Sequence, residues 1–77
     1  MQQQGKTDII YRIRSWRATC VSNGISYKKA IEKAELNYDS VINAMGSAMK
    51  GNPTAISDER MKQVEKATSL LILEKLL

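Results

Sequence analysis

Apolar residues recur at helical spacing in four separate segments of the chain. In the first segment, one apolar stripe has members at intervals of three or four residues, namely Ile9, Ile13, Trp16 and Cys20. Ile10 and Val21 lie beside this stripe. Thr7 or Asp8 is suited to cap this helix, and the pair Asn23-Gly24 is suited to end it. We therefore expect a first helix from about residue 8 to residue 22, with Trp16 and Cys20 in the core.

Two shorter helices are predicted next. Ser26 is a candidate N-cap for a helix from Tyr27 to about Glu35, whose apolar face holds Ala30, Ile31 and Ala34. Asn37 is the next candidate cap, and the helix that starts near Tyr38 carries apolar residues at helical spacing, namely Val41, Ile42, Met45 and Met49. Gly46 interrupts this pattern at a cost of up to roughly 1 kcal/mol relative to alanine, so we expect the regular helix to end there.

A last helix follows a loop over residues 50–54. Ser57 precedes two acidic residues, which is typical of a helix start, and the inner stripe of the helix is Met61, Val64, Thr68 and Leu71. No segment alternates as a strand does. The pattern predicts an all-α domain of four to five helices over residues 8–77, preceded by a flexible tail over residues 1–7.

The carboxyl end of the chain carries a second apolar stripe. Leu70, Leu73 and Leu77 lie well over 100° around the helix from Leu71. A small helical protein with two apolar faces on one helix needs a second partner, and we expect a homodimer through these leucines. In the alternative interpretation the chain bends and both stripes close one core.

The composition argues against stabilisation by a disulfide or a metal ion and against an enzymatic function. A chain of 77 residues buries a limited core; its single cysteine excludes an internal disulfide, and the absence of histidine argues against a zinc site. We expect no metal, no cofactor and no enzymatic activity, since histidine is absent and no carboxylate pair or nucleophile–base set is recognisable. No run of about 18 apolar residues and no signal-peptide pattern occurs, so a cytoplasmic protein without membrane contact is expected.

The net charge of +4 is unevenly distributed. Residues 1–56 hold eight basic and four acidic residues, whereas residues 57–77 hold four of each. The positive excess therefore lies in the first three quarters of the chain, where a polyanion is the expected partner.

Residues 26–45 combine two short helices, a connection of three or four residues and small side chains where the helices cross. This arrangement lets a second helix project from the body and lie in a DNA major groove. The stretch from Ala30 to Met45 resembles the helix-turn-helix of the lambda-repressor-like family of phage repressors and Cro proteins, and residues 49–53 and 56–67 are similar to its following loop and helix. Glu35 stands where the family usually has glycine, and Ile31 where it usually has alanine.

The resemblance implies a set of DNA-contacting residues. Its base-reading positions correspond to Asn37, Tyr38, Asp39, Ile42 and Asn43, with phosphate contacts from Lys28, Lys29, Lys33 and Lys50. Asparagine is suited to adenine, aspartate to the cytosine amino group and isoleucine to the thymine methyl. The alternatives are that Asn37 and Asp39 serve only as helix caps and that Tyr38 is a half-buried core ring.

The resemblance also implies a function. It predicts an operator-binding transcriptional regulator, a Cro-like repressor of phage or prophage origin that binds double-stranded DNA as a homodimer, without a small-molecule substrate. The alternative is a small helical protein–protein interaction module, an inhibitor or antitoxin-like protein that uses its apolar carboxyl end.

Overall fold

The computed structural model describes the backbone of residues 4–77 and the side chains from Asp8 onward. Four helices occur in this part of the chain, and no strand does: α1 (Gln4–Ser22), α2 (Tyr27–Lys33), α3 (Tyr38–Met49) and α4 (Asp58–Leu76). The Cα radius of gyration is 12.3 Å, close to the value of about 11–12 Å expected for a folded chain of this length. The prediction of an all-α domain is confirmed, with four helices.

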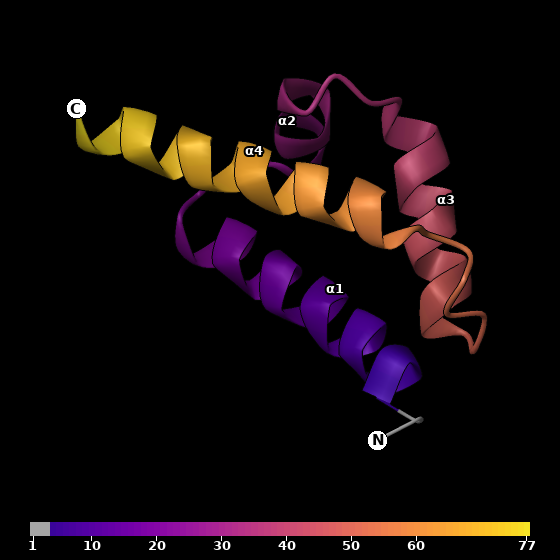
Figure 1. Cartoon of the computed structure of the whole chain (residues 1–77). Coiled ribbons are helices and arrows are strands. Elements are labelled where there is room, and N and C mark those ends of the chain that lie inside the picture. Colours follow the sequence, from indigo (N-terminus) through magenta and orange to yellow (C-terminus); the bar gives the residue numbers. More distant parts are fainter. Residues whose placement is uncertain (1–3) are drawn as a thin grey trace.

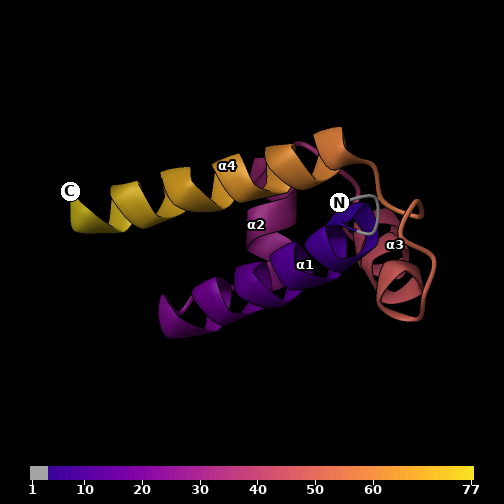
Figure 2. The ribbon, with the colours of Figure 1, turned by 60° about the horizontal axis from the view of Figure 1, so that its bottom comes forward.

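The long helices α1 and α4 lie side by side and run in the same direction (Figures 1 and 2). Three side-chain hydrogen bonds along this pair have nearly the same sequence separation, as expected for parallel helices. They join Arg12 to Glu65, Trp16 to Thr68, and Lys75 to the carbonyl of Asn23, with separations of 53, 52 and 52 residues. The short helix α2 packs against both of them. The remaining helix, α3, packs against α1 and α2 at the end of the domain opposite the carboxyl terminus (Figures 1 and 2).

The core is built from the stripes that the sequence predicts, with one exception. Buried members of these stripes come from every helix, among them Ile13, Trp16, Cys20, Ile31, Val41, Met45, Met61, Val64 and Leu71. Val21 was expected beside the first stripe, but its side chain is 71% exposed. At 100° per residue Val21 lies about 100° around α1 from Cys20, which takes it out of the core.

Three of the four predicted N-caps are confirmed; the cap of the first helix at Thr7 or Asp8 is wrong, because α1 begins at Gln4 and contains both residues. The side-chain oxygens of Ser26, Asn37 and Ser57 accept hydrogen bonds from the backbone amides of Lys29, Ser40 and Arg60 at 3.0, 2.9 and 3.1 Å. Each bond satisfies an amide that has no partner within its own helix. These caps fix where α2, α3 and α4 begin.

The start of α1 and the end of α3 differ from the predictions. Helix α1 begins at Gln4 rather than near residue 8, so part of the predicted tail is helical, while residues 1–3 lie outside the described residues. Gln4 and Lys6 are good helix formers, whereas Gly5 and Thr7 are poor ones, but no proline precedes Asp8 to forbid the extension. Helix α3 continues through Gly46 to Met49. A Cβ atom at Gly46 would meet nothing within 4 Å. No close packing therefore requires glycine here, and its effect is limited to its low helix propensity.

In the part of the chain that is described, no helix is both long and apolar enough to cross a membrane.

Candidate nucleic-acid interface

Helix α3 has one face in the core and one face at the surface. Val41, Met45 and Ala48 are buried and anchor the helix. On the opposite side, Asp39, Asn43, Gly46 and Lys50 recur at intervals of four, three and four residues, and all of these except the half-buried Gly46 are exposed. Asp39 and Asn43 take part in none of the side-chain hydrogen bonds or ion pairs within residues 8–77. Their polar groups are therefore available for an external partner.

The other three predicted base-reading residues have structural roles as well. Asn37 is exposed, but its side-chain oxygen caps α3. Tyr38 and Ile42 are half-buried and pack against the core, which agrees with the alternative interpretation of Tyr38. Of the five predicted positions, Asp39 and Asn43 are thus the ones whose side chains are both exposed and uncommitted.

A short turn connects α2 to α3. Helix α2 ends at Lys33, with Ala34 as its C-cap, two residues before the predicted end. Glu35 follows with φ of +63°, in the left-handed region, and the amide of Leu36 donates to the carbonyl of Ile31 at 3.2 Å. Leu36 then packs against the core. The left-handed residue reverses the chain, so that only four residues separate α2 from α3.

The predicted phosphate-binding lysines do not form one cluster. Lys28 and Lys50 are exposed at opposite ends of the α2–α3 unit. Lys33 forms an ion pair with Glu74 at 2.8 Å, and Lys29 lines a groove with Leu71, Glu74 and Lys75. Lys29 and Lys33 therefore lie beside the carboxyl end of α4, whereas Lys50 lies at the carboxyl end of α3.

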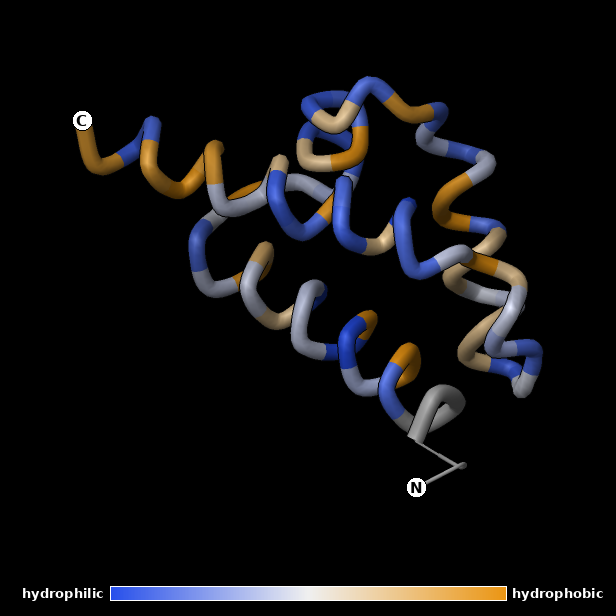
Figure 3. Tube along the Cα trace, in the orientation of Figure 1, coloured by the Kyte–Doolittle hydropathy of each residue, from blue (hydrophilic) through white to orange (hydrophobic). Residues whose placement is uncertain are grey.

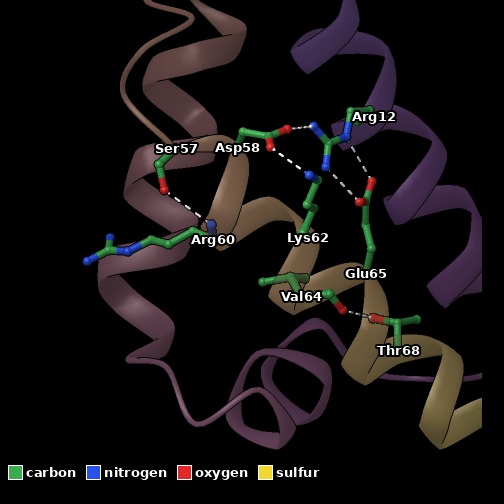
Figure 4. Close-up of polar contacts among 8 residues, drawn as sticks. All are labelled: Arg12, Ser57, Asp58, Arg60, Lys62, Val64, Glu65 and Thr68. Atoms are coloured by element: carbon green, nitrogen blue, oxygen red, sulfur yellow. Dashed lines mark hydrogen bonds and ion pairs between the residues drawn. The ribbon is translucent and has the colours of Figure 1, made fainter.

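Arg12, on helix α1, is committed to the fold rather than to an external partner. Its guanidinium donates to both carboxylate oxygens of Glu65, at 2.8 and 3.1 Å, and to Asp58 at 2.6 Å (Figure 4). Lys62 joins Asp58 at 3.2 Å. The Arg12 hydrogen bond, and after it the Lys62 hydrogen bond, hold the pKa of the Asp58 carboxyl below its usual value. Sequence reasoning missed this network, because its members are about 50 residues apart along the chain.

Hydrophobic residues predominate along the carboxyl end of α4, with a short hydrophilic stretch between them (Figure 3). Leu70, Leu73 and Leu77 are 43%, 56% and 104% exposed, and Leu76, which the sequence analysis did not single out, is 78% exposed. The alternative in which both leucine stripes close one core is therefore wrong for the single chain, since α4 continues as one helix to Leu76 and Leu71 is the one leucine that it buries. The exposed stripe has no cover within the described residues.

Comparison of the chain with protein-family models, with curated proteins and with solved structures finds no match.

Proposed function

We propose that this chain is a sequence-specific DNA-binding transcriptional regulator in which α2 and α3 act as a helix-turn-helix. The observation that carries the proposal is the division of α3 into an anchored apolar face and an exposed polar face. A helix held in this way can enter a major groove without losing its core contacts. A Cro-like protein of phage or prophage origin, acting in the bacterial cytoplasm, is the closest description that the sequence resemblance supports.

The geometry of the turn supports the same proposal. Glycine is the residue that adopts a left-handed backbone at the lowest steric cost, and the family that the chain resembles usually has glycine at the position of Glu35. Here glutamate adopts that backbone, with φ of +63°. Glu35 thus adopts a backbone conformation suited to such a turn, although the favoured glycine is absent.

Base reading is assigned chiefly to two side chains. Asn43 donates to and accepts from the major-groove edge of adenine, and Asp39 accepts from the amino group of cytosine. Ile42 and Tyr38 expose only part of their side chains, and they make a smaller contribution to base contacts than Asn43 and Asp39. Asn37 contributes through its amide nitrogen, because its oxygen is the helix cap.

Positioning on the duplex is assigned to the lysines and to backbone amides at the start of α3. Lys50 and Lys28 are exposed and act as phosphate contacts, while Lys29 and Lys33 add positive charge near α4. Such contacts set the register of the protein on DNA and carry no sequence information. Two copies of the chain, joined through Leu70, Leu73 and Leu77, give the regulator two reading helices for a palindromic operator, and occupation of a promoter is sufficient to block polymerase.

The test is duplex binding as a function of salt, followed by selection of bound sequences from random DNA. Proteins that neutralise phosphates lose affinity steeply as salt rises, because condensed counterions are released on binding. We expect a steep slope and enrichment of one inverted-repeat sequence. The absence of duplex binding at low salt would refute the proposal.

A protein–protein interaction module is the second candidate, and the exposed leucines of α4 are the observation in its favour. An exposed apolar surface of this kind marks an association site. The salt experiment separates the two candidates, since an apolar interface has no counterion release and gives no such slope.

A further inference from the structure

The outer face of α4 changes from polar to apolar along its length. Residues on this face follow one another at intervals of four and three, the spacing of a helix–helix seam: Glu59, Gln63, Lys66, Leu70, Leu73 and Leu77. All six are exposed. The first three are charged or polar, and the last three form what we call the leucine surface. A seam that is apolar over its last eight residues only is suited to a partner that overlaps those residues and no others.

We propose that a second copy of this chain covers the leucine surface, with the two α4 helices antiparallel and a two-fold axis beside Leu73. In this register Leu73 meets Leu73 of the other copy, and Leu70 meets Leu77 of the other copy. The contact is self-complementary, because both copies use the same patch. Every leucine of the seam gains an apolar neighbour, and the polar half of each α4 extends away from the interface.

The parallel arrangement is disfavoured by charge. Two parallel α4 helices in register would place Lys66 against Lys66 and Glu59 against Glu59 along the same seam. Like charges placed opposite one another across an interface are destabilising. The antiparallel overlap avoids both like-charge contacts, because it ends before Lys66.

The surface beside Leu70 is hollowed in a way that suits the antiparallel register. A shallow groove between α2 and α4 is lined by Ala34, Ala67 and Leu70, with Lys33, Gln63 and Lys66 around it. Leu77 of the other copy reaches this side of α4 in the antiparallel register. The small alanine side chains leave room for it, as a hole accepts a knob in packed helices.

A consequence for the operator follows, and it rests on the proposed function. Fifteen residues separate Asp58 from Leu73, which is about 22 Å along a helix axis. Helix α3 lies at the amino-terminal end of α4 (Figures 1 and 2), so the antiparallel dimer holds its two α3 helices more than about 45 Å apart. One turn of duplex spans about 34–36 Å. We therefore expect the centres of the two half-sites to lie more than one turn of duplex apart.

Disulfide trapping tests the antiparallel contact directly. The native thiol of Cys20 is fully buried, and burial raises its pKa, so wild type is the background control under mild oxidation. We expect Leu73→Cys to form a covalent dimer. A mixture of Leu70→Cys and Leu77→Cys should cross-link, whereas each of these variants alone should not. Gln63→Cys, on the same seam and also exposed, is the matched negative control.

Other cross-linking patterns overturn the proposal. Dimers of Leu70→Cys alone and of Gln63→Cys alone would show a parallel seam. No cross-link in any variant, together with a monomer by sedimentation at hundreds of micromolar, would remove the second copy as the occupant of the leucine surface.

The spacing is tested on duplexes that carry the selected half-site as an inverted repeat, with centres 10, 15 or 21 base pairs apart. We expect at least tenfold tighter binding at 15 or 21 base pairs than at 10, because only the two longer spacings exceed the separation of about 45 Å. A maximum at 10 base pairs, or no dependence on spacing, would overturn the inferred geometry. Failure to bind any duplex would instead refute the proposed function, and cross-linking would still decide the dimer.

Discussion

Trp16 donates a hydrogen bond from its indole Nε1 to the hydroxyl of Thr68 at 2.8 Å, and Thr68 donates in turn to the carbonyl of Val64 at 2.8 Å. Both side chains are almost fully buried, with exposed fractions of 3%. The Trp16 ring also packs on Tyr27, with ring centroids 5.1 Å apart. The hydroxyl of Thr68 thus satisfies the one polar atom of the tryptophan and joins α1 to α4 at the centre of the core.

Replacing Thr68 by valine keeps the shape of the side chain and removes the acceptor. The buried indole N–H then loses its partner, and we expect the free energy of unfolding to fall by about 1–3 kcal/mol. Thr68→Ser is the matched control: it keeps the hydroxyl and loses one methyl group, at a cost of about 1 kcal/mol. Urea unfolding measures both. A valine variant as stable as wild type would mean that the hydrogen bond contributes nothing to the fold.

The Arg12 network predicts a specific loss of stability in acid. The folded-state pKa of Asp58 is lowered, chiefly by the Arg12 hydrogen bond, so the stability that it contributes is present above the unfolded-state pKa of about 3.9 and is lost as the pH falls from there through the lower folded-state pKa. We expect Arg12→Gln to lower the melting temperature by a few degrees at pH 7 and by much less at pH 2–3. The surface pair of Lys62 with Asp58 is more exposed, so Lys62→Gln should have a smaller effect. Equal losses for Arg12→Gln at both pH values would contradict the ionic explanation.

Capping residues and apolar spacing made most of the fold predictable from the sequence. Ser26, Asn37 and Ser57 each identify a helix start, and the structure confirms all three caps. These are local signals: a cap bonds an amide three residues away, and a stripe is read within one helix. The same reasoning, extended along α3 from Asp39 to Asn43 and Lys50, is sufficient to find its exposed polar face.

Tertiary contacts explain what the sequence could not reveal. In the sequence, Arg12 cannot be told apart from other surface charges. In the fold it lies beside Asp58 and Glu65, which are 46 and 53 residues away along the chain. Gly46 reads as a helix end, yet neighbouring core residues such as Met45 and Ala48 hold the helix together through it. In both cases the outcome depends on packing partners, which outweigh local propensity.

The turn between α2 and α3 carries measurable strain at Glu35. A left-handed backbone costs a residue with a Cβ atom roughly 1–2 kcal/mol, whereas glycine loses roughly 0.5–1 kcal/mol through its greater freedom in the unfolded chain. We therefore expect Glu35→Gly to stabilise the protein by about 0.5–1 kcal/mol. Glu35→Ala, which removes the carboxylate and keeps the Cβ, is the control and should leave stability nearly unchanged. A glycine variant that is less stable than wild type would mean that the turn does not adopt this backbone in solution.

Asn43 and Lys50 are expected to play different roles on DNA, although both lie on the exposed face of α3. Asn43→Ala should weaken binding to the selected operator by about 1–3 kcal/mol and relax the preference at one base pair, because a bidentate contact to a base is lost. Lys50→Ala should weaken binding to all sequences alike and reduce the salt slope by about 1, because one phosphate contact is lost. Both side chains are exposed, so melting temperatures close to that of wild type are the control for folding. Fluorescence anisotropy on the operator and on a scrambled duplex gives both affinities. If the two variants lose specific and non-specific binding in equal measure, α3 is not the helix that reads the sequence.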